Sequence, residues 1–386
     1  MKKQLTRIAS WMLLATMGQA GALAQDIRID INQVYPEKTI SLQKVADVKY
    51  IPLETTDEVL FNGIVTNLSA EGIAGFNKKE GDILVFDGTG KAIASFNHTG
   101  QGPNEYNKIY HLDVDWKQKE VYVQDNFRQK IRIYGLDGRH LRTIDLQETM
   151  QEGDLYSFSD TRLIYYAQPK SKPVTAYEPV TLLSKKDASK VTLPFTKTDD
   201  NLVKATGGPF GDMKMSAKNV NLLCKKGDEV YVNEVTADVI YRVESNHALT
   251  PVVERTPSYQ DASGQDFFLM LTGANARYYF FKRQQALLEF QGNAATDTKS
   301  TYVAYDRKEK QLLNPTFTNE DYPSQDIPMS KLLQCAGSAN RCYLQLEAFK
   351  LKEALAEGKL KGTLKSIAEK LDEEDNPVLM VVEFKK

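Results

Sequence analysis

The 386-residue sequence is poor in cysteine (3 residues), histidine (4) and tryptophan (2), and it lacks a long apolar run beyond its first residues. So few cysteines cannot form the dense disulfide network of a small secreted domain. The longest strongly apolar run, residues 267–271, suits a buried strand and is far shorter than the ~20 residues that span a bilayer.

A surplus of positive charge is also missing. The formal net charge is −2, and it becomes −5 without residues 1–24, which carry Lys2, Lys3 and Arg7 and no acid. Nucleic acid and anionic membrane surfaces both require a basic surface. The composition therefore argues against a nucleic-acid partner, and the sequence predicts no membrane span.

The first 24 residues have the pattern of a secretory signal peptide. A positive start precedes the apolar residues 8–14, and Ala22-Leu23-Ala24 matches the small-x-small pattern that signal peptidase cuts after. No cysteine follows the apolar stretch, so the usual lipid attachment point is absent. We expect cleavage near Ala24 and a periplasmic or secreted protein that is not a lipoprotein.

Two of the cysteines flank a turn-prone segment. Cys335 and Cys342 are seven positions apart, and in an oxidising compartment they are candidates for a disulfide across a hairpin. The alternative is two separate buried thiols. Cys224 follows an apolar run and is expected to be a core residue.

The clearest positive signal is a unit of four short strands in residues 112–145. Alternating residues 112–116 predict one strand and residues 120–124 a second, while residues 131–134 and 140–146 follow as a third and a fourth. Asp137-Gly138 is a hairpin turn between the last two. Four antiparallel strands in about 35 residues match one blade of a β-propeller.

This unit recurs along the chain. Residues 229–234 repeat residues 120–125, and third strands are predicted to begin near residues 83, 131, 180, 239 and 301. A last strand at residues 378–384 supplies a sixth. The spacing predicts an all-β, six-bladed β-propeller.

The ends of the chain are predicted to close the ring. Residues 25–46 form an N-terminal extension, and residues 47–386 form the propeller, in which strand 47–53 pairs with strand 378–384 and leaves no exposed edge. Residues 346–371 are rich in Lys, Glu, Leu and Ala, which predicts a short helical insertion near the C-terminus.

Two motifs carry a resemblance to known families. Residues 121–134, followed by Asp137-Gly138, resemble the NHL repeat. Residues 100–106, Gly-Gln-Gly-Pro-Asn-Glu-Tyr, resemble the G-x-G-P-G-E-Y loop of a six-bladed β-propeller family of exported bacterial proteins, and the ending at residues 375–380 resembles that family's closing strand. Asn104 replaces the usual glycine, and the lipoprotein cysteine common in the family is missing. The family has no settled activity, so the resemblance implies a fold rather than a function.

Strand order in such a fold predicts where a ligand would bind. The loop into each first strand and the turn between second and third strands emerge on one face, which we expect to bind ligands at the mouth of the channel. The candidates on that face are Gly100, Gly102, Pro103, Glu105, Tyr106, Asp125, Asn126, Arg128, Glu234 and Asp238. The alternative interpretation is structural: Glu105 accepts N–H groups of its loop, Asp125 holds its own turn and Arg128 pairs with a neighbouring blade.

Catalytic signatures are few. No nucleophile elbow or phosphate-binding loop occurs, and no two histidines have the spacing of a local zinc motif; His98 and His111 remain weak metal candidates. Asp113 and Asp115 share one strand face, where two carboxylates could bind calcium or serve a hydrolase, or form an ordinary polar face. No cofactor is predicted, with calcium as the one ion to consider.

Two functions follow from this pattern. The first is a non-catalytic binding or scaffold protein of the cell envelope that presents a loop-lined face to a glycan, peptide or protein. The alternative is a propeller enzyme, a lyase or lactone-type hydrolase, with a metal at the channel mouth.

Overall fold

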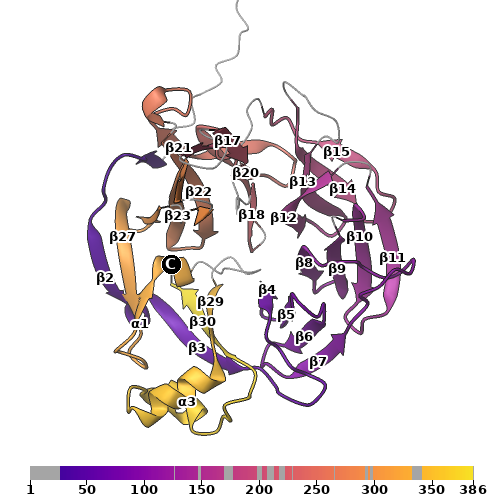
Figure 1. Cartoon of the computed structure of the whole chain (residues 1–386), viewed down its shortest axis with the longest axis vertical. Coiled ribbons are helices and arrows are strands. Elements are labelled where there is room, and N and C mark those ends of the chain that lie inside the picture. The colour runs from indigo at the N-terminus through magenta and orange to yellow at the C-terminus, as the bar shows by residue number, and fades with distance from the viewer. Residues whose placement is uncertain are drawn as a thin grey trace, which may run out of the picture.

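A computed structural model shows six sheets, each built around antiparallel strands, arranged in a ring around a central channel (Figure 1). It describes residues 27–125, 127–146, 149–168, 177–197, 202–206, 213–216, 222–227, 229–264, 266–291, 294–295, 299–332 and 341–385. The signal peptide, Asn126 and Cys335 of the sequence predictions lie outside these ranges. The predicted six-bladed propeller is confirmed.

The first three blades each contain four strands, ordered outward from the channel. They are β4 (Ile64–Leu68), β5 (Gly72–Phe76), β6 (Ile83–Asp87) and β7 (Ala92–Phe96); β8 (His111–Asp115), β9 (Glu120–Asp125), β10 (Lys130–Gly135) and β11 (His140–Asp145); and β12 (Thr149–Ser157), β13 (Arg162–Gln168), β14 (Val180–Ser184) and β15 (Lys190–Thr192). The third strands begin at or within one residue of the predicted positions. The alternation of apolar residues in the sequence was therefore sufficient to locate the strands of these blades.

The fourth and fifth blades gain outer strands from the N-terminal segment. Their own strands are β18 (Leu223–Lys226), β19 (Glu229–Val232), β20 (Val239–Val243) and β21 (Leu249–Thr256), then β22 (Phe267–Ala274), β23 (Tyr278–Gln285), β26 (Ser300–Asp306), β27 (Gln311–Thr318) and the short β28 (Asp326–Pro328). β1 (Ile27–Asp30) pairs in parallel with β21, and β2 (Glu37–Ser41) pairs in parallel with β27. The predicted extension thus forms part of two blades.

In the described residues the sixth blade has three strands, β29 (Arg341–Leu346), β30 (Val378–Phe384) and β3 (Ala46–Pro52). β3 comes from the N-terminal part of the chain and pairs antiparallel with β30, with Asp47 opposite Glu383. Its backbone covers an edge that β30 would otherwise expose, so the two ends of the chain meet in one sheet.

The predicted helical insertion lies between β29 and β30 at the periphery of the ring (Figure 1). α3 (Ala348–Ala356) ends where Gly358 adopts a φ of +68°, and α4 (Gly362–Ala368) follows. Of the helices in the described residues, α3 is the longest with nine residues, and none combines the length and apolar character of a membrane span.

The remaining elements are small. α1 (Leu42–Val45) links β2 to β3, α2 (Met329–Leu332) follows β28, and a 3₁₀ turn covers Ala262–Gly264. A separate sheet, which the sequence analysis did not predict, combines β16 (Leu202–Thr206), β17 (Met213–Ser216), β24 (Leu287–Gln291) and β25 (Ala294–Ala295).

Apolar side chains fill the spaces between neighbouring blades. Five buried clusters each join two adjacent blades, and a further one spans the third, fourth and fifth blades; one of the five, for example, contains Tyr122 and Ile133 of the second blade with Leu163 of the third. Because the strands within a blade alternate in direction, the β4–β5 and β6–β7 turns and their counterparts lie on one face, which we call the hairpin face. Second-to-third strand turns and the connections between blades lie on the opposite, connection face.

Candidate functional site

The predicted loop of residues 100–106 lies on the connection face and is held by polar contacts. The Glu105 carboxylate accepts the Gly102 N–H at 2.6 Å, and a Cβ atom on Gly100 would lie 2.0 Å from that carboxylate, so a larger residue there would displace it. Arg132 donates to the Pro103 carbonyl at 2.8 Å, and the Tyr134 hydroxyl donates to the Asn104 carbonyl at 2.7 Å. Both partners belong to β10, so the loop lies over the third strand of its blade rather than at the channel mouth, where we expected it.

The turn after β9 is joined to this loop. Asp125 is fully buried, and its carboxylate accepts the N–H groups of Asn107 at 3.0 Å and Arg128 at 3.3 Å. The Arg128 guanidinium donates to the carbonyls of Gly100 and Gly102 at 3.2 and 3.3 Å. Asp125 and Arg128 therefore join the turn to the loop, and Glu105 holds the loop internally. The structural roles expected for Glu105 and Asp125 are observed, whereas Arg128 pairs with the loop before its own blade rather than with a neighbouring blade.

The joined loop and turn present a large aromatic side chain to solvent. Phe127 lies between Asp125 and Arg128 in the chain and is 74 % exposed. Gln101, Pro103 and Asn104 beside it are exposed as well, whereas Tyr106 is fully buried and donates its hydroxyl to the Gly81 carbonyl at 2.7 Å. We call residues 100–106 with Asp125, Phe127 and Arg128 the loop pair.

The other two acidic candidates also have structural partners. Glu234 is buried between the third and fourth blades, where it forms an ion pair with Lys197 at 3.0 Å and accepts the Tyr166 hydroxyl at 2.7 Å. The Asp238 carboxylate accepts the Ser258 hydroxyl and the Tyr259 N–H, both at 2.6 Å. The structure does not bring these two residues into the loop pair.

A polar network in the channel was largely missed by sequence reasoning. The Asp113 carboxylate on β8 accepts hydrogen bonds from three other blades: from Asn67 Nδ2 at 2.7 Å, from the Ser157 N–H at 2.6 Å and from Lys225 Nζ at 2.8 Å. A bulge in β4 between Val65 and Asn67 changes the register of that strand next to Asn67. Asp113 thus links the first four blades.

Asp115 on the same strand face extends the network. Its carboxylate pairs with Lys185 Nζ at 2.6 Å, and the same ammonium donates to the Ser157 hydroxyl at 2.8 Å and lies 5.2 Å from the centre of the Tyr122 ring. Only 4 % of the Lys185 side chain is exposed. The strand face that carries the two aspartates is therefore a set of buried ion pairs.

Electrostatics keep these groups charged. Burial alone would raise the pKa of Asp113, but Lys225 and the other donors outweigh it and the pKa falls below its ordinary value. The pKa of Asp115 is lowered in the same way, with Lys185 as its main partner. Burial lowers the pKa of Lys185, and Asp115 opposes that shift. Each carboxylate has a cation beside it, which leaves no surplus negative charge to attract a metal ion.

The two histidine candidates have different surroundings. The His98 ring stacks on Tyr134 and its Nε2 lies 2.7 Å from the Gly138 carbonyl oxygen. The His111 ring packs edge-on against Tyr156, and its buried Nε2 has no hydrogen-bond partner in the part of the chain that the structure describes. Burial lowers the pKa of His111 to about 4, so its imidazole is neutral at pH 7.

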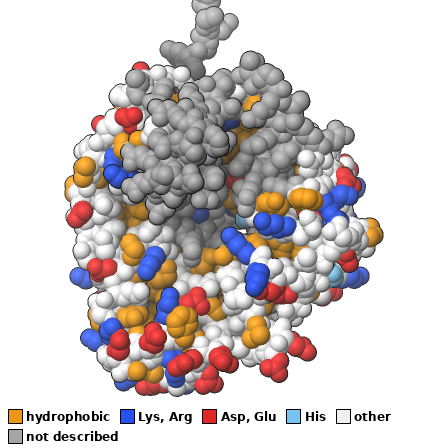
Figure 2. Space-filling view, viewed as in Figure 1, with side chains coloured by type: hydrophobic (Ala, Val, Ile, Leu, Met, Phe, Trp, Pro, Cys, Tyr) orange, Lys and Arg blue, Asp and Glu red, His pale blue; other side chains and the backbone are white. Residues whose placement is uncertain are grey.

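Within the described ranges, no three His, Cys, Asp or Glu side chains are grouped so that they could hold a metal ion. Cys342 is buried in β29 and Cys224 in β18, while the predicted partner Cys335 lies outside those ranges, so the disulfide stays a prediction. On the face in Figure 2, acidic and basic side chains are interspersed rather than separated.

The sequence matches a known family along almost the whole chain. The model of a domain of unknown function, DUF4934, matches residues 26–383. The chain belongs to this family. No curated protein matches the sequence.

Solved structures support the fold of this DUF4934 protein. BF0058 from Bacteroides fragilis NCTC 9343, named as an exported protein, is 15 % identical with a TM-score of 0.59, covering 91 % of this chain and 99 % of its own. A member of the DUF4221 family from Bacteroides vulgatus ATCC 8482 is 9 % identical with a TM-score of 0.50, covering 89 % and 98 %. At these identities the likeness concerns the fold alone.

Proposed function

We propose that this DUF4934 protein is a non-catalytic binding or scaffold propeller of the cell envelope, and that its loop pair contacts a glycan, peptide or protein. The observation that carries the proposal is the exposure of Phe127 on a turn whose neighbours Asp125 and Arg128 are both committed to holding it. A rigid aromatic side chain gives contact area with little loss of conformational entropy on binding. Exposed Gln101 and Asn104 beside it add amide groups for hydrogen bonding.

The proposal includes a location outside the cytoplasm. The first 24 residues have the composition of a signal peptide, and the similar B. fragilis protein is named as exported. We therefore expect cleavage near Ala24 and a periplasmic or secreted protein without a lipid anchor. Mass spectrometry of the protein purified from its host tests this through the mass of its N-terminal peptide.

A binding screen tests the function. Fluorescently labelled protein is applied to glycan and peptide arrays as wild type, as Phe127→Ser and as Ile93→Ser. Ile93 is the matched control, because it is 49 % exposed and lies on β7 away from the loop pair. The proposal predicts a signal that Phe127→Ser loses and Ile93→Ser keeps; equal signals from the two variants would contradict it.

Metal analysis addresses the alternative, a lyase or lactone-type hydrolase with a metal at the channel mouth. Two observations oppose that alternative: the channel carboxylates Asp113 and Asp115 are each paired with a lysine, and His98 and His111 have different neighbours. Calcium and zinc are quantified in the purified protein by mass spectrometry. Stoichiometric metal would favour the enzyme over the binding protein.

A further inference from the structure

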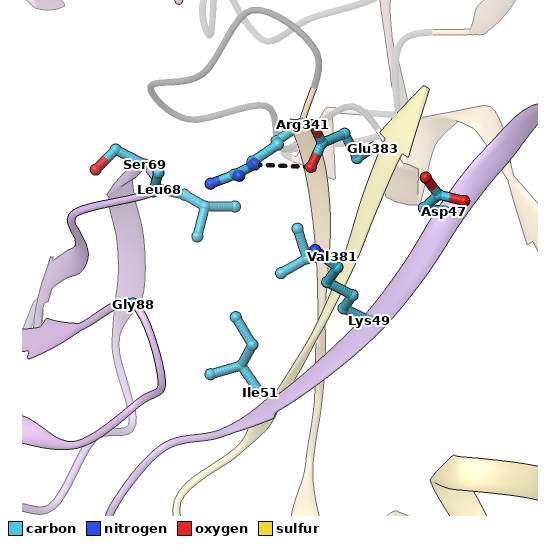
Figure 3. A pocket seen from close by; sticks show the side chains of 10 residues that line it. Asp47, Lys49, Ile51, Leu68, Ser69, Gly88, Arg341, Val381 and Glu383 are labelled. Carbon is cyan, nitrogen blue, oxygen red and sulfur yellow. Dashed lines mark hydrogen bonds and ion pairs between the residues drawn. The ribbon is translucent and has the colours of Figure 1, made fainter. Parts of the chain in front are cut away.

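A pocket of about 220 Å³ opens where the ring closes, between the sixth and first blades (Figure 3). One side is formed by the closing sheet, through β3, β29 and β30. The other is formed by the β4–β5 and β6–β7 turns of the first blade on the hairpin face. The residues around it are Asp47, Lys49, Ile51, Leu68, Ser69, Ala70, Gly88, Arg341, Val381 and Glu383.

The inner wall is apolar. Ile51, Leu68 and Val381 belong to the core between these two blades, and Leu68 and Val381 are almost completely buried. Ile51 is only partly buried, so it is the apolar side chain of this wall that a ligand can contact, with Leu68 and Val381 packed behind it.

The rim carries more free positive than free negative charge. Glu383 accepts from Arg341 Nε at 3.2 Å, and Asp47 pairs with Lys385 at 2.9 Å. Figure 3 shows the terminal nitrogens of Arg341 directed away from Glu383 toward Ser69 and Leu68. Lys49 is exposed and forms no ion pair with any residue that the structure describes. An ammonium and the outer edge of a guanidinium are thus available to an anion.

The turns that form the opposite wall are pre-organised. The Ser69 hydroxyl accepts the N–H groups of Glu71 at 3.1 Å and Gly72 at 3.2 Å. A Cβ atom on Gly88 would lie 2.5 Å from the Ala70 carbonyl oxygen, so this close approach of the two turns requires glycine. The pocket needs no rearrangement of these turns to accept a ligand.

We infer that this seam pocket binds a carboxylate attached to a small apolar group, as in a short branched acid or a peptide C-terminus that ends in leucine. The carboxylate would lie between Lys49 and Arg341, and the apolar group against the partly exposed side chain of Ile51. The pocket volume equals that of about seven water molecules, which fits one amino-acid-sized group. A phosphate dianion fits less well, because Glu383 and Asp47 stand on the same rim.

Calorimetric titration of the full chain after the predicted signal peptide tests this inference. The probes are 4-methylpentanoate, its uncharged analogue 4-methylpentan-1-ol, acetyl-Gly-Gly-Leu with a free carboxylate, and the same peptide as its amide. We expect the acid to bind at least tenfold more tightly than the alcohol. Binding of the free-carboxylate peptide but not the amide identifies a peptide terminus as the source; binding of the small acid alone identifies a free acid. Equal affinity for charged and uncharged probes, or no binding, overturns the inference.

Variants locate the site. Lys49→Met keeps the length of an exposed side chain and removes its charge, so we expect tenfold weaker binding of the acid. Ala70→Phe fills the mouth of the pocket while both cations remain, and it should abolish binding. Lys79→Met, an exposed lysine at another turn, and Phe127→Ser should both bind as wild type. An unchanged affinity in Lys49→Met would contradict the assignment, whatever the array screen of the loop pair shows.

Discussion

Single buried polar residues in the channel decide how this propeller responds to pH and to substitution. Asp113 is the most connected of them, since it accepts hydrogen bonds from the first, third and fourth blades. His111 lies two residues earlier on the same strand and has a buried ring nitrogen without a described partner. Substitution of Asp113 should therefore destabilise the protein, whereas substitution of His111 should make it less sensitive to acid.

Asp113→Asn removes a charge that compensates Lys225. An uncompensated buried charge typically costs about 3–5 kcal/mol of stability, so urea unfolding should show a loss near 3 kcal/mol. The control, Asp160→Asn, breaks an ion pair with Lys117 in which both side chains are exposed, and should lose far less stability than Asp113→Asn. Equal losses in the two variants would show that Asp113 does not support the channel.

His111→Phe should reduce the sensitivity of the protein to acid. The folded-state pKa is about 4, against an ordinary value of 6.5, so only the unfolded state gains a proton between these values. This contribution to stability is complete above pH 6.5 and is lost as the pH falls toward 4, which amounts to about 2–3 kcal/mol by pH 4.5.

Urea unfolding of wild type and His111→Phe at pH 7 and pH 4.5 measures this difference. The loss between the two pH values should be smaller in the variant by about 2–3 kcal/mol. His247→Asn, at a surface hairpin turn where Asn tolerates the φ of 70°, should lose as much as wild type. An identical pH dependence in wild type and His111→Phe would contradict the buried, neutral histidine.

Within the loop pair, the loop of residues 100–106 is held to the turn after β9 chiefly by the side chain of Arg128. Arg128 provides three hydrogen bonds to residues 100–102, so Arg128→Ala should release that loop without unfolding the blade. Hydrogen–deuterium exchange should accelerate in residues 100–106 and remain slow in β9 and β10. Arg139→Ala, an exposed arginine at the next hairpin, is the control. Unchanged exchange in the loop would show that Arg128 is not what holds it.

Elements with a local signal could be predicted from the sequence, and elements with distant partners could not. Alternating apolar residues and turn dipeptides such as Asp137-Gly138 placed the third strands within one residue of their observed starts. β1 and β2 were predicted only as an extension, because β1 pairs with β21 and β2 with β27, strands more than 200 residues away. A short strand that pairs in parallel with the outer edge of a blade has no sequence pattern that identifies its distant partner.

In the candidate site, too, contacts between residues close in the sequence could be predicted and contacts between distant residues could not. The contacts of Glu105 and Asp125 within their own segments were foreseen, because acidic side chains in turns commonly accept nearby N–H groups. The lysines of the channel were missed, since Lys225 and Asp113 are 112 positions apart in the sequence. A signal was present: Lys225 follows the apolar residues 222–224, where a charged side chain on an inner strand needs a partner.

At the scale of the whole molecule, closure of the ring depends on β3. β1 and β2 extend blades that already have four strands, whereas β3 covers β30 in a blade with fewer described strands. A chain that begins at Ala46 should therefore stay compact, keep the oligomeric state of the longer chain and melt at a lower temperature. A chain that begins at Leu53 should lose cooperative unfolding and associate through the bare edge of β30.

Size-exclusion chromatography with light scattering, followed by thermal unfolding, distinguishes the two truncated chains. If the chain that begins at Leu53 is monomeric and melts as cooperatively as the longer one, β3 does not close the ring.

In the function proposed above, this propeller binds through its loop pair while the channel serves as a polar core. The most direct test is hydrogen–deuterium exchange of the protein with and without the glycan or peptide that gives the strongest array signal. We predict slower exchange in residues 100–106 and in the turn after β9, and no change in β8. Slower exchange confined to β8 and the segment around Lys225 would place the ligand in the channel and contradict the account.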